Sequence, residues 1–379
     1  MRVQGLRLLL AFVTATGCSS NSSSGGGGTV TVSASGETFA LSGYAFPPTA
    51  DQEVLVVDGW AVAFTKVLVV IDKPRLSENP DQSPSDPSKL GKTVAQLEGG
   101  PWAVDLAKAG DRDGVGGSGD KAWMLGIIDK QNTNGNAAID GAQRYAFSYD
   151  TVAATSSVKA FRGLEANDAD FAEMVQKGYS HFLIGTATFK ADAASCKGAI
   201  ASYDYTKMPK AVDFRFGLSA PVSALNCQNG DLKGAALTGE TLQRGVQAKA
   251  GSTAIAQIVL HLDHLFWQTV VHDLGVPHFD HLAAQAKDAN GKFVVTNAEL
   301  GAASLAPVKD SAGNSVPWRS CVEESKYKLP TAPAEFTMDT QGNTGIQNIS
   351  DFIKTTGATM HHLNAEDGFC YVPGFSTVK

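Results

Sequence analysis

The sequence predicts a mainly β protein: an antiparallel β-sandwich-like domain at 29–260, joined to a smaller α-rich, disulfide-tied segment at 261–379. Three observations favour this fold class. Short segments alternate apolar and polar residues with the period of a half-buried strand. Tight turns, built on some of the 39 glycines, separate these segments. From residue 261 the alternation ends and helix-capping patterns appear, and the length of 379 residues suggests roughly two domains.

The composition is that of a globular protein with few surface charges, because 43% of its residues are hydrophobic and 18% are charged. The formal net charge is −7, and it becomes −9 without residues 1–17, whose only charges are Arg2 and Arg7. The sequence has no basic stripe that would neutralise phosphates. Nucleic acid is therefore not an expected partner.

Residues 1–17 combine two arginines, a short apolar run and small residues at the end, which predicts a secretory signal peptide. The small residues before Cys18 resemble the lipobox of bacterial lipoproteins, although Ala15 stands where that pattern usually has Leu. This resemblance makes Cys18 a lipid anchor that carries acyl chains such as palmitate, with residues 18–28 as a flexible Ser/Gly tether. Ser19 after the cysteine then implies sorting to the outer membrane, facing the periplasm or the cell surface. An ordinary signal peptide is the alternative.

Four cysteines follow the tether, and an even number in an exported protein predicts two disulfides. Pairing of nearest neighbours is the default among three possible connectivities, because each bond then brackets one segment. Ligation of a metal by thiolates is disfavoured, because the sequence contains no CxxC pattern. The predicted bonds are Cys196–Cys227 and Cys321–Cys370.

The N-terminal part reads as a series of strands joined by glycine turns. The first strand is predicted at 29–35, and a strand at 53–60 leads through a turn at Asp58 and Gly59 into a strand at 60–71, which Pro74 is expected to end. One helix interrupts the series at 167–178, with Asn167 as its N-cap and Gly178 at its end. Further strands are predicted at 102–106, 182–189, 212–216 and 257–262.

Helices are predicted beyond the last of these strands. Asp263 can cap a helix at 264–273, and Pro277 can begin another at 278–287. A third helix is expected at 350–357.

Residues 288–299 resemble a degenerate EF-hand loop, so Asp288, Asn290 and Glu299 are candidate calcium ligands. Ala286 stands where the first ligand of such a loop belongs. Thr296 and Glu299 also form a capping-box pattern, and a plain helix–turn–helix corner is the alternative.

The clearest chemical pattern is a histidine-rich stretch at 261–281, which holds five of the eight histidines of the chain. It contains the pattern His-x-Asp-His twice, at 261–264 and at 278–281. Imidazole is the most common protein metal ligand, and a nearby carboxylate can fix its tautomer.

We therefore expect a copper or zinc site with His261 at a strand end, His264 in the next turn, and His361 or His362 from the tail. Asp263 and Asp280 are expected as ligands or as orienting partners. A Cys321–Cys370 bond would pin the tail to the body of the protein and preorganise this site.

Other functions receive less support from the residues. The pattern His-x-His-x-Asp-His of metallo-β-lactamases lacks its first histidine here, because Val259 and Val276 occupy those positions. A metal-dependent hydrolase therefore comes third, and no nucleophile elbow G-x-S-x-G is present. The main alternative is a non-enzymatic adhesion or scaffold module, in which tryptophans of the β domain would contact a polymer or a partner protein.

Taken together, the lipobox-like Cys18, the tether, the run at 261–267 and the tail at 362–370 resemble large uncharacterised lipoproteins of environmental Gram-negative bacteria, which have no known activity. The four later cysteines and residues 214–221 are weakly similar to periplasmic copper-binding proteins that partner di-haem enzymes. This second resemblance implies copper as the metal, although most of that family's pattern is missing from the chain.

Overall fold

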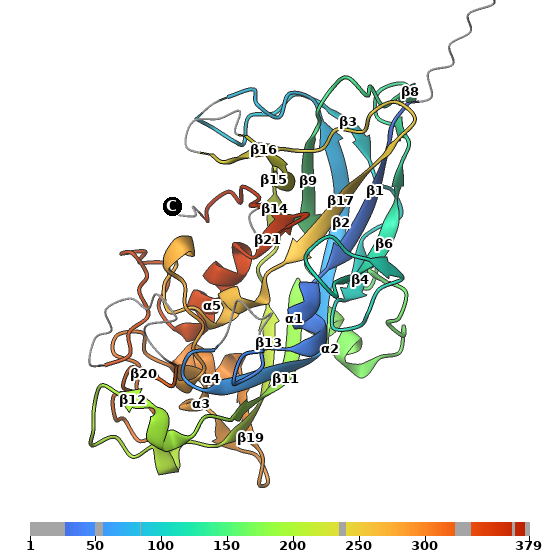
Figure 1. Ribbon diagram of the computed structural model, residues 1–379. Helices are drawn as coiled ribbons and strands as arrows, with labels where there is room; N and C mark the ends of the chain where they lie inside the picture. The colour runs from blue at the N-terminus through green and yellow to red at the C-terminus, as the bar shows by residue number, and fades with distance from the viewer. Residues whose placement is uncertain are drawn as a thin grey trace, which may run out of the picture.

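The computed structural model describes residues 27–49, 56–83, 85–234, 240–322, 335–365 and 368–375. The predicted signal peptide, Cys18 and most of the tether lie outside these residues. Strands dominate the described part of the chain and form two larger sheets and three small ones (Figure 1), which confirms the mainly β fold class.

The smaller of the two main sheets contains the first and the last strand of the described chain. Strand β1 (Thr29–Ser35) pairs in parallel with β17 (Thr253–Leu260), with Thr29 opposite Thr253 and Ser35 opposite Val259. The other pairings within this sheet are antiparallel. In spatial order, its strands are β21 (His361–Leu363), β17 (Thr253–Leu260), β1 (Thr29–Ser35), β6 (Lys121–Ile128) and β5 (Arg112–Asp113).

The larger sheet has β2 at its centre and is mostly antiparallel, with parallel pairs at β10–β4 and β13–β19. Its main path is β10 (Lys159–Ala160), β4 (Trp102–Asp105), β2 (Trp60–Ser77), β11 (His181–Phe189), β13 (Ala211–Leu218), β19 (Phe293–Thr296) and β18 (Lys287–Asp288). Beside this path, β3 (Thr93–Gln96) and β9 (Ala146–Thr151) pair with β2, and β14 (Val222–Ala224) pairs with β9.

Short elements complete the described structure. The small sheets are β7 (Lys130–Gln131) with β8 (Ala137–Ala138), β12 (Lys197–Gly198) with β20 (Arg319–Ser320), and β15 (Gln228–Lys233) with β16 (Leu242–Arg244). The α-helices are α1 (Glu37–Ser42), α2 (Ala169–Lys177), α3 (Asp280–Ala283), α4 (Asn297–Ala302) and α5 (Ile349–Ala358). The 3-10 helices are η1 (Ala193–Ser195), η2 (Tyr205–Lys207), η3 (Leu262–Phe266) and η4 (His272–Leu274). In the part of the chain that the structure describes, none of the helices combines the length and apolar character that crossing a membrane requires.

The predicted end of the second long strand at Pro74 is wrong, because β2 continues to Ser77. Its pairing with β9 shifts register between Asp72 and Arg75, and Lys73 adopts a left-handed φ of 48° there. A bulge leaves one residue out of the hydrogen-bonded ladder, so a proline without an N–H is tolerated at that point.

The predicted helix at 264–273 is also wrong. The segment forms η3 and η4 with extended chain between them, and the side chains of 264–269 are all buried. Its backbone pairs with a distant segment, since Val270 N–H donates to Asp339 O and Asp339 N–H donates to Gln268 O. A segment whose side chains are buried in several directions does not need an amphipathic helix to bury one face.

The helix predicted at 278–287 is confined to α3, because its start is held by a side chain from far away. Both Phe279 N–H and Asp280 N–H donate to Asp58 Oδ2, at 2.8 and 2.7 Å. The helix therefore begins after Pro277 rather than at it, and it ends at Ala283.

The predicted disulfide pairing is wrong, because the bonds are Cys196–Cys321 and Cys227–Cys370. Sheet pairing explains both. Strand β12 follows Cys196 directly and pairs with β20, which ends just before Cys321. Leu225 pairs with Tyr371, and this places Cys227 beside Cys370. Contacts between strands therefore override nearness in the sequence.

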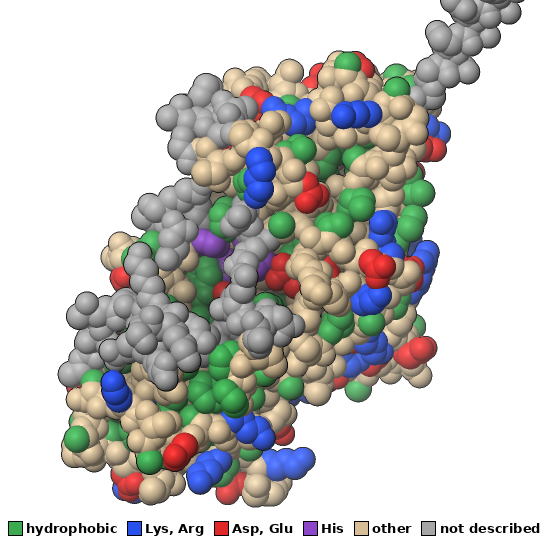
Figure 2. Space-filling view, viewed as in Figure 1, with side chains coloured by type: hydrophobic (Ala, Val, Ile, Leu, Met, Phe, Trp, Pro, Cys, Tyr) green, Lys and Arg blue, Asp and Glu red, His purple; other side chains and the backbone are tan. Residues whose placement is uncertain are grey.

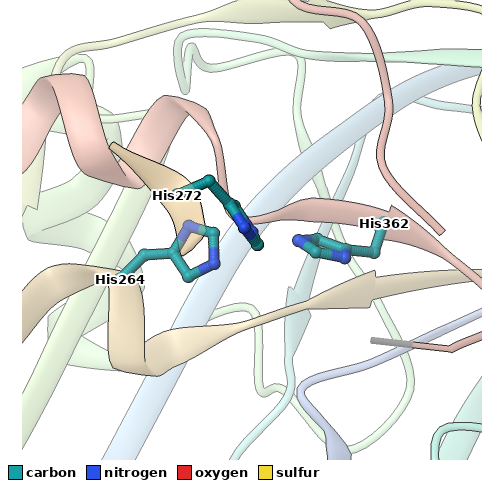
Figure 3. Close-up of side chains that lie close together, drawn as sticks. All are labelled: His264, His272 and His362. Carbon is teal, nitrogen blue, oxygen red and sulfur yellow. The ribbon is translucent and has the colours of Figure 1, made fainter. Parts of the chain in front are cut away.

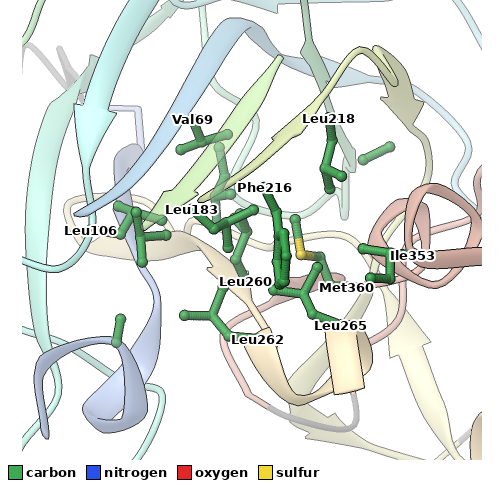
Figure 4. Close-up of a cluster of buried hydrophobic side chains, with 14 of the residues drawn as sticks. Val69, Leu106, Leu183, Phe216, Leu218, Leu260, Leu262, Leu265, Ile353 and Met360 are labelled. Atoms are coloured by element: carbon green, nitrogen blue, oxygen red, sulfur yellow. The ribbon is translucent and has the colours of Figure 1, made fainter. Parts of the chain in front are cut away.

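One hydrophobic core extends through both predicted parts of the chain. It contains residues from Val30 to Cys370, and Figure 4 shows side chains of η3, α5 and the large sheet, such as Leu265, Ile353 and Phe216, in one buried cluster. The structure does not test the domain boundary at residue 260, which stays a prediction.

Candidate metal centre

Strand β21 divides the two histidines of the tail between opposite faces. His362 lies opposite Val259 of β17, and His361 lies opposite Leu260. Because successive side chains of a strand point to opposite faces, only one of the two can face a given centre. His362 faces η3 and η4.

His264, His272 and His362 form a compact group at the place where η3, η4 and β21 meet (Figure 3). Each ring offers one nitrogen, and these nitrogens lie within 4.8 Å of one another. The ring centroids are 5.0 Å apart for His264 and His272, and 5.6 Å apart for His264 and His362. His264 and His362 are buried and His272 is half-buried, so the group can be reached from the side of η4. Figure 2 shows histidine atoms at a hollow of the molecular surface. We refer to this group as the outer triad.

Hydrogen bonding fixes the tautomer of His264. Thr359, at the end of α5, donates its hydroxyl proton to Thr356 O at 2.7 Å. The Thr359 oxygen therefore accepts from His264 Nδ1–H, which lies 3.0 Å away. The lone pair of His264 is consequently on Nε2, and a partner outside the triad holds the ring in place.

Aromatic side chains surround the outer triad. Trp267 stacks on His264 with 3.7 Å between ring centroids, and Phe369 lies 4.2 Å from the ring of His272. Burial and the neighbouring histidines hold the pKa of His264 well below its usual value. The imidazole therefore stays neutral near pH 7, which is the form that binds a metal.

A second group shares His264 with the outer triad. His261, Asp263 and His264 offer ligand atoms that also lie within 4.8 Å of one another, and all three residues are buried. We refer to this group as the inner group. Asp263 Oδ2 accepts from Trp267 Nε1–H at 2.9 Å, and Asp263 Oδ1 lies 3.6 Å from His261 Nδ1.

Glu37 of α1 completes the surroundings of the inner group. His261 Nε2–H donates to Glu37 Oε1 at 3.0 Å, and Glu37 has a left-handed φ of 57°. Burial lowers the pKa of His261, but the carboxylates of Asp263 and Glu37 outweigh burial and raise it to about 10. Burial also raises the pKa of the Glu37 carboxyl. The metal-free inner group therefore holds an imidazolium between two carboxyl groups.

His361, which the sequence offered as an alternative to His362, lies in the core on the other face of β21. Its Nδ1 is 3.1 Å from the hydroxyl of Tyr149, and its ring centroid is 5.4 Å from that of His181. Burial holds the pKa of His361 well below its usual value. His361 belongs to neither group of candidate ligands.

The second copy of His-x-Asp-His, at 278–281, makes contacts that stabilise the fold. Asp280 accepts from Arg319 Nε at 2.6 Å, and Asp58 holds the start of α3 beside it. Burial and Asp58 raise the pKa of Asp280 to about 7 against the opposing effect of Arg319. His278 and His281 are buried among aromatic rings.

The candidate calcium ligands are engaged in turns and caps. Asp288 Oδ1 accepts from Gly291 N–H, and Asn290 has a left-handed φ of 61°. Glu299 Oε2 accepts from Thr296 in the predicted capping box, and its Oε1 lies 3.2 Å from Lys287 Nζ. Calcium binding here remains a prediction that these contacts do not test.

Sequence reasoning missed His272 and Glu37 as members of the centre. His272 lies in the same histidine-rich stretch, but it belongs to neither His-x-Asp-His copy. Glu37 is 224 residues from His261, so no local pattern joins them.

A scan against family models finds no match, and searches of curated proteins and solved structures find no significant similarity.

Proposed function

We propose that this protein binds one copper or zinc ion through His264, His272 and His362 and is anchored to the outer membrane by a lipid on Cys18. The observation that supports metal binding is the convergence of three imidazole nitrogens within 4.8 Å of one another. Three neutral nitrogen donors suit copper and zinc, whereas calcium and magnesium prefer oxygen ligands.

The residues around the outer triad also support binding of a metal. Thr359 leaves Nε2 of His264 with its lone pair, as a ligand requires. Trp267 and Phe369 restrict the space around the rings. A site in which partners outside the ligand set fix the rings loses little entropy when the ion binds.

Metal uptake by the mature protein tests this proposal. Protein stripped of metal is exposed to Cu(I) and to Zn(II), and the bound ion is counted by elemental analysis and by competition with a chelator. We expect one ion per chain, and we expect His272→Ala to weaken its binding by roughly 100-fold.

His281→Leu is the matched control, because His281 is a buried histidine outside both groups. It should bind metal like the wild type. Absence of copper and zinc uptake by the wild type, or uptake by His272→Ala at wild-type affinity, would contradict the proposal.

The proposed anchor is supported by the signal-like residues 1–17, the lipobox-like Cys18 and the tether. Mass spectrometry of the N-terminal peptide from the native host tests this part separately. A mature chain that begins at unmodified Cys18, or elsewhere, would exclude the lipid.

A further inference from the structure

We infer that a cavity between α5 and the turn at 340–343 binds a single sugar ring. The cavity has a volume of about 200 Å³. Pockets for drug-sized ligands measure roughly 300–1,000 Å³, so this one suits a smaller ligand of about a dozen heavy atoms. The inference goes beyond the proposed function, because the residues of the outer triad and of the inner group do not line this cavity.

Side chains with hydroxyl and amide groups line the cavity, among them Thr340, Gln341, Asn343, Thr355 and Thr359. Neither the Thr340 hydroxyl nor Asn343 Nδ2 donates a hydrogen bond to another described residue, so both can donate to a ligand.

The same wall offers acceptors. Thr355 donates its hydroxyl proton to Asp351 O at 2.9 Å and keeps its lone pairs. Gln341 Nε2 donates to Asp339 Oδ2, which leaves Gln341 Oε1 as an acceptor. A ring that carries several hydroxyls matches this mixture, because each hydroxyl both donates and accepts.

Phe375 supplies an apolar surface for the C–H face of a sugar ring. Its side chain is half-buried, packs against the small cluster that contains Ala358 and Val372, and also lines the cavity. Its N–H donates to Val372 O at 3.1 Å. An aromatic ring held in this way can stack on a ligand with little loss of side-chain entropy.

Several hydrogen bonds fix the turn that carries Gln341 and Asn343. Asp339 Oδ1 accepts from Gln341 N–H at 2.9 Å, and Asn343 N–H donates to Thr340 O at 3.0 Å. Asn343 Oδ1 accepts from Gly345 N–H at 2.9 Å, which orients its amide group. The donors and acceptors are therefore in place before a ligand binds, and binding costs little further ordering.

Thr359 lines the cavity and also contacts the outer triad, because its hydroxyl accepts from His264 Nδ1–H and donates to Thr356 O. The experiment therefore uses the metal-free protein. Its outcome then does not depend on whether the outer triad binds a metal.

Titration calorimetry of the full-length mature protein tests the inference with four probes: glucose, galactose, mannose and N-acetylglucosamine. We expect at least one of them to bind at one molecule per chain. Its dissociation constant should be on the order of 1 mM, because so small a ligand makes few contacts.

Two variants locate the bound sugar. Thr355→Val removes a hydroxyl at nearly constant shape, and Phe375→Ala removes the stacking surface, so each should weaken binding by roughly 10-fold. Thr344→Val and Phe293→Ala are the matched controls, because both residues are exposed and neither lines the cavity. The controls should bind the sugar like the wild type.

Absence of binding of all four sugars at tens of millimolar would overturn the inference, and the proposed metal site would still stand. Wild-type affinity in both Thr355→Val and Phe375→Ala would also overturn it, because the sugar would then bind elsewhere. Near-ultraviolet circular dichroism of each variant shows that its fold is intact.

Discussion

At the scale of single residues, the partners of each imidazole decide what that histidine does. His264 has one nitrogen held by Thr359 and the other directed to a shared centre, so it is suited to bind a metal. His281 stacks on Phe336 with 4.8 Å between ring centroids, and among the described residues neither of its nitrogens has a hydrogen-bond partner. Both are fully buried, and identical sequence patterns surround His264 and His281, so only their contacts distinguish a ligand from a core residue.

The buried, neutral His281 makes the metal-free protein sensitive to acid. Burial lowers its pKa to about 3, whereas in the unfolded chain it is near the ordinary value of 6.5. Between these values the unfolded state binds more protons, so stability is lost as the pH falls below 6.5. Between pH 6 and pH 4, we expect the free energy of unfolding of the wild type to fall more steeply than that of His281→Leu, by about 1.4 kcal/mol per pH unit.

Urea unfolding of the metal-free proteins at three or more pH values across this range measures the effect. Phe336→Leu is the control, because it alters the same packing without removing a titrating group. The difference in free energy of unfolding between Phe336→Leu and the wild type should be the same at every pH. Parallel pH curves for the wild type and His281→Leu would refute this account.

At the scale of elements, α2 shows how far local sequence signals reach. The helix and its end at Gly178 were predicted, but its N-cap is Asp168 instead of Asn167. Asp168 Oδ1 accepts from Asp170 N–H and Phe171 N–H, and its other oxygen pairs with Lys66 of β2. A partner on a neighbouring strand thus selects between two adjacent residues that are equally able to cap.

Substitution at these two positions tests the assignment of the cap. Asp168→Ala should lower the free energy of unfolding by about 1–2 kcal/mol, because it removes the cap and the contact with Lys66. Asn167→Ala should leave it nearly unchanged. Chemical denaturation measures both values, and a larger loss for Asn167→Ala would restore the cap that the sequence predicts.

At the scale of the whole molecule, the centre is assembled from segments that lie far apart in the chain. Glu37, the stretch at 261–272 and His362 meet because β1, β17 and β21 are neighbours in one sheet. The Cys227–Cys370 bond closes a sequence separation of 143 residues, and Cys370 N–H donates to His361 O on the strand that carries His362. This disulfide therefore restrains β21, the strand that carries His362.

The two disulfides should differ in their effect on metal binding. Replacing Cys227 and Cys370 by Ala should weaken binding at the outer triad by about 10-fold or more, because β21 loses its restraint. Both double variants should lose a few kcal/mol of stability, because both bonds close long loops. Replacing Cys196 and Cys321 should have little effect on the affinity for metal. Chelator competition and thermal unfolding separate the two effects, and equal affinities in both double variants would contradict this assignment.

Local sequence signals were enough to predict the mainly β class, the approximate positions of β1, β2, β4, β11, β13 and β17, the capped helices α2, α4 and α5, and the stretch in which the histidine cluster lies. Each of these depends on local periodicity or on contacts within one turn of chain. Only the tertiary structure shows the disulfide pairing, the burial of residues 264–269, the position of His362 instead of His361 beside η3, and the proximity of His272 to His264 and of Glu37 to His261. These depend on which strands are neighbours, and strand pairing follows from burial of the whole core, which no local pattern encodes.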